Sequence, residues 1–154
     1  MGRQRCRQMG ERLPLLPGAR EAVARLAARW PLGLASSSNP PIIELVLELT
    51  ALKERFRVTV SSEEVGRGKP APDVYLEAAR RLDVLPEDCA AIEDSHNGIR
   101  SAHGAGMCVL AIPNQAFPPD EEALALADCV LESLDELTVE AVTSCESAAS
   151  RRAR

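Results

Sequence analysis

Two adjacent carboxylates, Glu93 and Asp94, are the residues of this chain best suited to chemistry. An apolar run that suits a buried strand (89–92) precedes them, and a polar, helix-forming stretch follows. Side chains on a strand alternate between faces, so both carboxylates can approach one ion only where the strand ends and the backbone curls. Open α/β sheets bind ligands at the carboxyl ends of their strands, and carboxylate oxygens suit Mg²⁺. The pair therefore predicts a Mg²⁺ site, and a solvated acidic turn that caps a helix is the alternative.

Two segments upstream fit the same end of a parallel sheet. Residues 32–39 form an apolar, strand-like run that ends in hydroxyls, the first of which is Ser36. Residues 66–73 place Lys69 in a loop stiffened by prolines, just before a predicted helix. The order along the chain is therefore a hydroxyl, a lysine and an acidic pair.

In this order, and with these flanks, the three segments resemble motifs two, three and four of the haloacid dehalogenase superfamily, in its β-phosphoglucomutase-like and phosphatase-like branch. The stretches GKPAPDVYLEAARRL and EDSHNGIRSAHGAGM are similar to that branch almost letter for letter. The matching pieces cover roughly 15–113. The resemblance implies Mg²⁺-dependent phosphoryl transfer on a small phosphorylated metabolite, such as a phosphate ester or a sugar phosphate, by a phosphatase or a phosphomutase.

The resemblance also implies a role for each candidate residue. Glu93 and Asp94 would hold Mg²⁺ directly or through water, Lys69 would pair with the phosphoryl group and the nucleophile, and Ser36 would hydrogen-bond a phosphoryl oxygen. An exposed loop lysine is the alternative for Lys69. Ser37 and Ser38 compete with Ser36 for its role, and these serines could equally be turn formers. Further candidates for ligand contacts, with turn formation or capping as their alternative roles, are Ser37, Asn39, Ser95 and Asn97. His96 and His103 lack partners at metal-ligand spacing, and we expect neither to act in catalysis.

The nucleophile of the family is missing from this chain. Family members carry it on an N-terminal strand that ends in Asp-x-Asp and is followed by a helical cap, whereas the first aspartate here is Asp73. We therefore expect the chain to be the C-terminal part of such an enzyme and to be inactive or weakly active by itself. The alternative is a noncatalytic remnant that binds Mg²⁺ or phosphate, or that serves as a partner surface. The cap selects the substrate in this branch, so the sequence does not predict the substrate.

Alternating strands and helices predict an α/β fold with a Rossmann-like, doubly wound parallel sheet. By resemblance, this core is incomplete, because the Asp-x-Asp strand would lie between the strands that end at Ser36 and at Glu93. Each of these strands would then expose unpaired backbone groups. We expect self-association, or pairing with a missing N-terminal segment.

The expected division of the chain has three parts. We predict a basic tail or cap remnant over 1–12, a partial haloacid dehalogenase core over 13–138, and the end of a terminal helix with a tail over 139–154, disordered past about Cys145. A helix over about 41–55 is apolar nearly all round, which predicts cover on more than one side.

Composition and charge exclude several classes of protein. The net charge of −5 argues against a nucleic-acid partner. No apolar run approaches the roughly 20 residues of a membrane span, and the arginine-rich start is not followed by the apolar core of a signal peptide. Five cysteines form an odd set without CxxC spacing, so we expect reduced thiols in a cytoplasmic protein, with a zinc site or disulfides as the alternatives.

Overall fold

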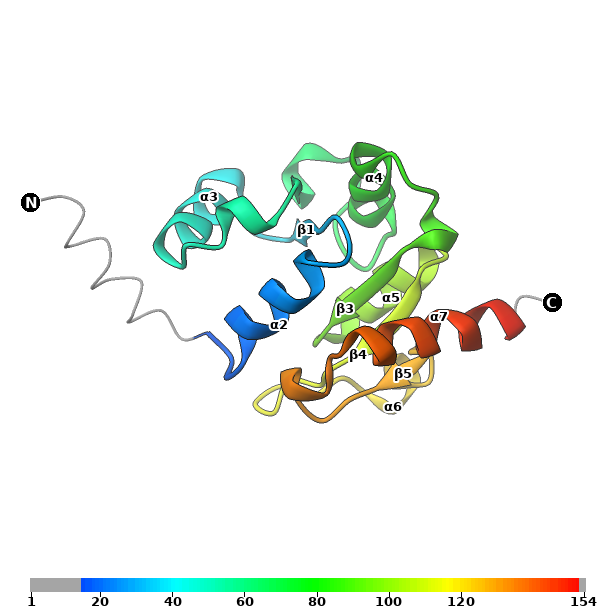
Figure 1. Cartoon of the computed structure of the whole chain (residues 1–154). Coiled ribbons are helices and arrows are strands. Elements are labelled where there is room, and N and C mark those ends of the chain that lie inside the picture. Colours follow the sequence, from blue (N-terminus) through cyan, green and yellow to red (C-terminus); the bar gives the residue numbers. More distant parts are fainter. Residues whose placement is uncertain (1–14, 153–154) are drawn as a thin grey trace, which may run out of the picture.

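The computed structural model describes residues 15–152, and their side chains as far as 147. Short strands alternate with helices in this range (Figure 1). The strands are β1 (Gly33–Ser36), β2 (Val58–Ser61), β3 (Ala90–Glu93), β4 (Cys108–Ala111) and β5 (Cys129–Val130). The α-helices are α2 (Ala19–Ala27), α3 (Pro40–Leu49), α4 (Asp73–Leu82), α5 (His96–Gly104), α6 (Glu121–Leu124) and α7 (Val139–Arg152). Single 3₁₀ turns lie at Lys53–Arg55, Ser62–Glu64, Pro86–Asp88 and Leu134–Glu136.

The strands form two separate parallel sheets. β1 pairs with β2, and Gly33 lies opposite Val58. β4 lies between β3 and β5, with Ala90 opposite Cys108. Within the described residues, no strand pairs with the second edge of β1 or of β3. The predicted parallel α/β fold is confirmed, and it is incomplete between the two strands where the sequence predicted a missing neighbour.

Helices cover both faces of the sheets and create two cores. α4 packs on β1 and β2, and α5 packs on β3 and β4, so that Val60, Val74 and Ile99 share one core. α2 and α7 lie on the opposite side, where Leu26 packs with Leu110 of β4. Because every residue of β4 is buried, this strand contributes side chains to both cores.

α3 is shorter and more exposed than its composition predicted. Asn39 caps its start by accepting a hydrogen bond from the backbone N–H of Ile42. The helix ends at Leu49 instead of about residue 55, because Ala51 adopts a left-handed conformation with φ of 55°. The helix buries Ile43 and Leu47, whereas its more exposed apolar side chains include Ile42, Leu45 and Val46. The second cover that the sequence predicted is not supplied by the described part of the chain.

The expected disorder past about Cys145 is wrong for the backbone up to Arg152. α7 continues to that residue as one helix. The burial of Val142 and Cys145 anchors its first half, and alanine and arginine, which are strong helix formers, are frequent in its second half. The predicted tail over 1–12 lies outside the described residues. No helix in the described range is both long enough and apolar enough to cross a membrane.

Candidate active site

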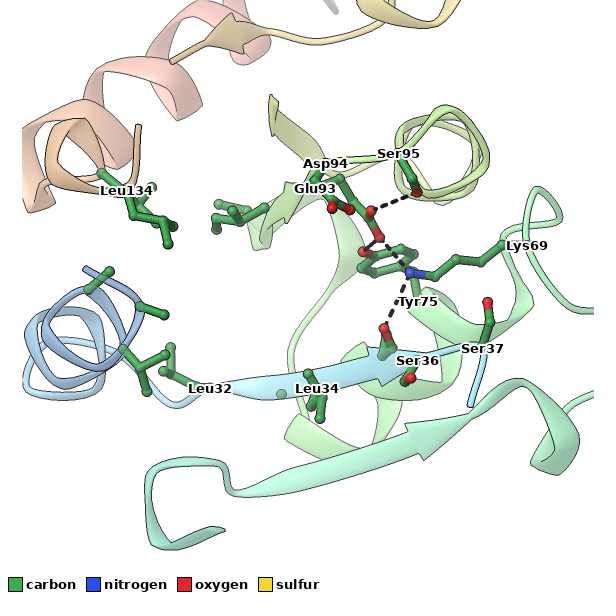
Figure 2. Close-up of a pocket in the computed structure, with 18 of the residues that line it drawn as sticks. Leu32, Leu34, Ser36, Ser37, Lys69, Tyr75, Glu93, Asp94, Ser95 and Leu134 are labelled. Atoms are coloured by element: carbon green, nitrogen blue, oxygen red, sulfur yellow. Dashed lines mark hydrogen bonds and ion pairs between the residues drawn. The ribbon is translucent and has the colours of Figure 1, made fainter. Parts of the chain in front are cut away.

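A cavity of about 970 Å³ separates β1 from β3 (Figure 2). We call this cavity the slot. Apolar side chains line most of its length, among them Leu32 just before β1, Leu34 in β1, Ile92 of β3 and Leu26 of α2. Polar groups gather at the end where both strands reach their carboxyl termini, and they include Ser36, Ser37, Lys69, Glu93, Asp94 and Ser95. The slot thus combines an apolar channel with a polar end, the usual position of ligands in open α/β sheets.

Lys69 bridges the two sheets at this polar end. Its ammonium donates to Glu93 Oε1 over 2.5 Å and to the carbonyl of Ala35 in β1 over 3.2 Å. Only 11% of the Lys69 side chain and 6% of the Glu93 side chain are exposed. This ion pair is therefore largely withdrawn from water, and the hydrogen bond to Ala35 helps to compensate the ammonium for its lost hydration.

Tyr75 completes the surroundings of this ion pair from α4. Its hydroxyl donates to the same oxygen of Glu93, and the Lys69 ammonium lies 4.9 Å from the centre of its ring. Burial, and then the negative charge of Glu93, raises the pKa of Tyr75 well above its ordinary value, so the phenol stays protonated as a donor. Tyr75 was not among the site residues predicted from the sequence. Tyr75 is the single tyrosine of the chain and lies in the first turn after the Lys69 loop, and this position could have indicated a role in the site.

The start of α5 closes around Glu93. A Cβ atom on Gly98 would lie 1.8 Å from Glu93 Oε2, so only glycine allows this approach. Ser95 caps α5 by accepting from the Gly98 N–H over 3.1 Å, and its own hydroxyl lies 3.4 Å from the same carboxylate oxygen. The predicted curl after the strand is confirmed, and it encloses Glu93.

Asp94 is the more accessible of the two predicted metal ligands. Its side chain is half-buried and lines the slot. Asn114, which follows β4, donates from Nδ2 to Asp94 Oδ2 over 3.3 Å, and its backbone N–H donates to the Asp94 carbonyl. Asn114 is thus a neighbour of the site that sequence reasoning missed. Within residues 15–152, no group of three or more histidine, cysteine, aspartate or glutamate side chains is placed to hold a metal ion.

The polar candidates of the first strand separate into two groups. Ser36 and Ser37 line the slot, and Ser36 Oγ also accepts a hydrogen bond from the Ser38 N–H over 3.1 Å. Asn39 is not among the residues that line the slot, and its side chain caps α3. Asn97, at the start of α5, lines the slot as predicted.

His96 also lies at the slot, in a polar cluster at its rim. Its Nδ1 lies 2.8 Å from Asp120, and Arg100 donates to its Nε2 over 3.1 Å. Phe117, which is 82% exposed, lines the slot beside it. Neither histidine was predicted to act in catalysis, because neither has a partner at metal-ligand spacing in the sequence. His103 is exposed near the end of α5, away from this cluster.

Comparisons with known proteins agree with this arrangement. The model of a haloacid dehalogenase-like hydrolase family matches residues 3–106. Hexitol phosphatase B of Escherichia coli K12 is 42% identical over 129 residues, which are 83% of this chain and 58% of that protein. β-Phosphoglucomutase of Bacillus subtilis is 39% identical over 82% of this chain and 53% of its own length. The chain thus spans little more than half the length of these relatives.

A solved structure shares the fold and part of the sequence. CbbY of Rhodobacter sphaeroides, determined in complex with phosphate, superposes with a TM-score of 0.76 at 34% identity. The match covers 84% of this chain and 59% of CbbY. The family model, the relatives and this structure confirm the resemblance seen in the sequence, and the chain belongs to the haloacid dehalogenase-like hydrolases.

Proposed function

We propose that this chain supplies the phosphate-binding and metal-binding part of an enzyme that transfers phosphoryl groups from small phosphate esters or sugar phosphates. The observation that carries the proposal is the convergence of Ser36, Lys69 and Asp94 at one end of the slot. Phosphoryl transfer depends mainly on positioning and on neutralising negative charge, and these side chains can do both. The names of the relatives, which include phosphatases and a mutase, support the same class of reaction.

Lys69 and Ser36 each keep a donor for a phosphoryl oxygen. An ammonium has three N–H donors, and Lys69 uses two of them on Ala35 and Glu93. Ser36 accepts from the Ser38 N–H, which leaves its own O–H able to donate. Both groups therefore bind phosphate without giving up their present contacts.

The carboxylates fit a Mg²⁺ ion shared with the substrate. Magnesium in proteins commonly binds through one or two carboxylates together with phosphate oxygens and water, which suits a site with fewer than three acidic side chains. Asp94 would be the direct ligand. Glu93 would act through water, because Lys69 and Tyr75 already donate to its Oε1. The bound ion would supply neutralisation of the phosphoryl charge.

We further propose that the nucleophile enters on an extended segment that occupies the slot. β1 and β3 both offer an unpaired edge to the slot, and the apolar side chains between them suit a buried parallel strand. A strand that runs parallel to both would place its carboxyl end beside Lys69 and Asp94. An aspartate there, supplied by an N-terminal segment that this sequence lacks, would meet the needs of the reaction.

A noncatalytic role is the second candidate. The charge of Lys69 is already balanced by Glu93. This ion pair favours a module that binds Mg²⁺ or phosphate without turnover. Self-association through the slot edges belongs with this reading, because a second copy would cover the same unpaired groups.

Hydrolysis of an aryl phosphate separates the two candidates. The chain is assayed alone and mixed with the N-terminal part of hexitol phosphatase B that it does not cover, with Mg²⁺ and with a chelator. We expect little turnover alone and Mg²⁺-dependent turnover on mixing. Lys69→Ala and Asp94→Ala should each lower the rate by about 100-fold or more. Lys53→Ala is the matched control, since Lys53 is exposed, pairs with Glu44, and is not among the residues that line the slot.

Two outcomes would contradict parts of this proposal. Turnover by the chain alone that requires Lys69 and Asp94 would support the enzyme but overturn the separate nucleophile segment, because the nucleophile would then lie within this sequence. Mg²⁺ binding measured by calorimetry, lost in Asp94→Ala but never accompanied by turnover on mixing, would favour the noncatalytic module.

A further inference from the structure

Two buried thiols lie almost within bonding distance on the side of the sheet away from α4 and α5. Cys108 begins β4, Cys145 lies in α7, and both are only 3% exposed. Their sulfur atoms are 2.7 Å apart, although the residues are separated by 37 positions in the sequence. A disulfide has an S–S distance of about 2.05 Å, so the two sulfurs must approach by about 0.65 Å to close the bond.

The surroundings favour a bond between these two sulfurs over the other pairings. Both side chains belong to the core formed with Leu110 and Val142, which holds them face to face across the contact between β4 and α7. Cys129 lies in the neighbouring strand β5, where it pairs with Leu110 of β4 instead of Cys108. It is also more exposed than Cys108 and Cys145. Cys89 directs its thiol to the carbonyl of Leu85 over 3.3 Å.

We propose that Cys108 and Cys145 form a reversible disulfide that fastens α7 to β4. A small disulfide such as oxidised glutathione is the oxidant. The thiolate of one cysteine attacks it, releases one glutathione thiolate and forms a mixed disulfide. The thiolate of the other cysteine then attacks the protein sulfur of that mixed disulfide and releases the second glutathione. The two protons lost by the protein thiols are taken up, through the solvent, by the two released glutathione thiolates, so that the two electrons and the two protons end on two molecules of reduced glutathione.

Access to the thiols requires α7 to open. Burial raises the pKa of both thiols, so few thiolates exist while the helix is packed. A helix near the end of the described chain can unpack locally without global unfolding. Closure of the bond would then tether α7 to β4. It would also restrain the segment just before α7, whose Leu134 and Leu137 carbonyls accept hydrogen bonds from Arg25 of α2. The inference does not depend on the proposed function.

Mass spectrometry of the oxidised chain tests the bond directly. Cleavage after glutamate separates the three cysteines of this region, because Glu121 and Glu122 lie between Cys108 and Cys129, and further glutamates lie between Cys129 and Cys145. After treatment with oxidised glutathione, we expect the mass to fall by two hydrogens and the Cys108 and Cys145 peptides to be linked. Dithiothreitol should separate them again, and mild urea, which opens α7, should speed their formation.

Variants and melting measurements complete the test. Cys129→Ala and Cys89→Ala should still form the link, whereas Cys145→Ala should not. Oxidation should raise the melting temperature of the wild type by roughly 10 °C, because the bond closes a loop of moderate length. A link from Cys129, stable glutathione adducts in place of the link, or no oxidation even in mild urea would overturn the proposal. The peptide map of the wild type decides the question even if Cys145→Ala folds poorly.

Discussion

The two sheets of this chain contain similar strands but differ in how completely they are covered. β4 has a strand on each side, α5 on one face and α7 on the other, and all four of its residues are buried. β1 has a single partner strand, and none of its four residues is fully buried. Both strands are short, and each mixes leucine or valine with small residues. The difference in burial therefore reflects their neighbours more than their composition.

This difference identifies the slot as the weak point of the fold. A parallel strand is normally buried on both faces and paired on both edges, and β4 meets these conditions. β1 instead has the slot on its free edge, where Leu32 and Leu34 line open space. The β3–β4–β5 sheet should therefore be the stable unit, and the β1–β2 sheet should depend on whatever else fills the slot.

A leucine-to-alanine substitution in each sheet tests whether the two sheets differ in stability as their burial predicts. Leu110→Ala in β4 removes a side chain that is 0% exposed and leaves a closed cavity, so we expect a loss of about 2–5 kcal/mol in the free energy of unfolding. Leu34→Ala in β1 removes a half-buried side chain that borders an existing cavity, so we expect about 1 kcal/mol. Urea unfolding of both variants measures the difference. Equal losses would mean that the slot is not an open region in solution.

The ion pair at the polar end sharpens the comparison, because it joins the two sheets. Lys69 comes from the loop before α4, which packs on β1 and β2, and Glu93 ends β3. Glu93→Gln leaves the ammonium without its countercharge in a largely dry place, and we expect a loss of about 3 kcal/mol. The double variant with Lys69→Met removes both charges and should lose less than the sum of the single variants. Urea unfolding of the four proteins gives the coupling energy.

An exposed pair between α3 and the 3₁₀ turn that follows it provides the control for this cycle. Lys53 and Glu44 lie at a similar distance from each other, but 48% and 62% of their side chains are exposed. The corresponding variants, Glu44→Gln and Lys53→Met, should show a coupling too small to resolve, because water screens such pairs. Coupling at Lys69 and Glu93 no larger than in the control would mean that the pair does not tie the sheets together.

The sequence contained much of the fold and of the site because both follow from local patterns. The alternation of strands and helices came from periodicity. The meeting of Ser36, Lys69 and Asp94 came from the rule that parallel strands end at one edge together with the family resemblance, since Lys69 lies in the loop before α4. The gap between β1 and β3 followed from the resemblance, together with the lack of any aspartate before Asp73. Each of these inferences uses residue types at known positions along the chain.

The remainder depended on contacts between distant residues, which local patterns do not encode. The hydrogen bond from Tyr75 to Glu93 spans 18 positions, and the one from Asn114 to Asp94 spans 20. A helix that is apolar on all sides, such as α3, predicts cover without saying whether this chain provides it. The prediction that Glu93 and Asp94 hold Mg²⁺, directly or through water, did not include the hydrogen bonds that Lys69 and Tyr75 donate to Glu93.

Removing a helix cap should show the smallest difference in stability loss between α3, beside the β1–β2 sheet, and α5, on the β3–β4–β5 sheet. Asn39 caps α3 at an exposed N–H of Ile42, and Ser95 caps α5 at the N–H of the buried Gly98. In Asn39→Ala, water can replace the lost acceptor, so we expect about 0.5–1 kcal/mol. In Ser95→Ala, water reaches the freed N–H less easily, and the neighbouring Glu93 loses the hydroxyl 3.4 Å away, so we expect about 1–2 kcal/mol.

Hydrogen exchange of the two capped amides checks the physical reason behind this difference. The Ile42 amide should exchange quickly in the native state, because α3 is half-exposed and can fray without disturbing either core. The Gly98 amide should exchange only when α5 leaves β3 and β4, a much rarer opening. If Asn39→Ala proved the more costly change and Ile42 the slower amide, α3 would have cover in solution that the described chain does not supply, and the region beside the slot would be closed instead of open.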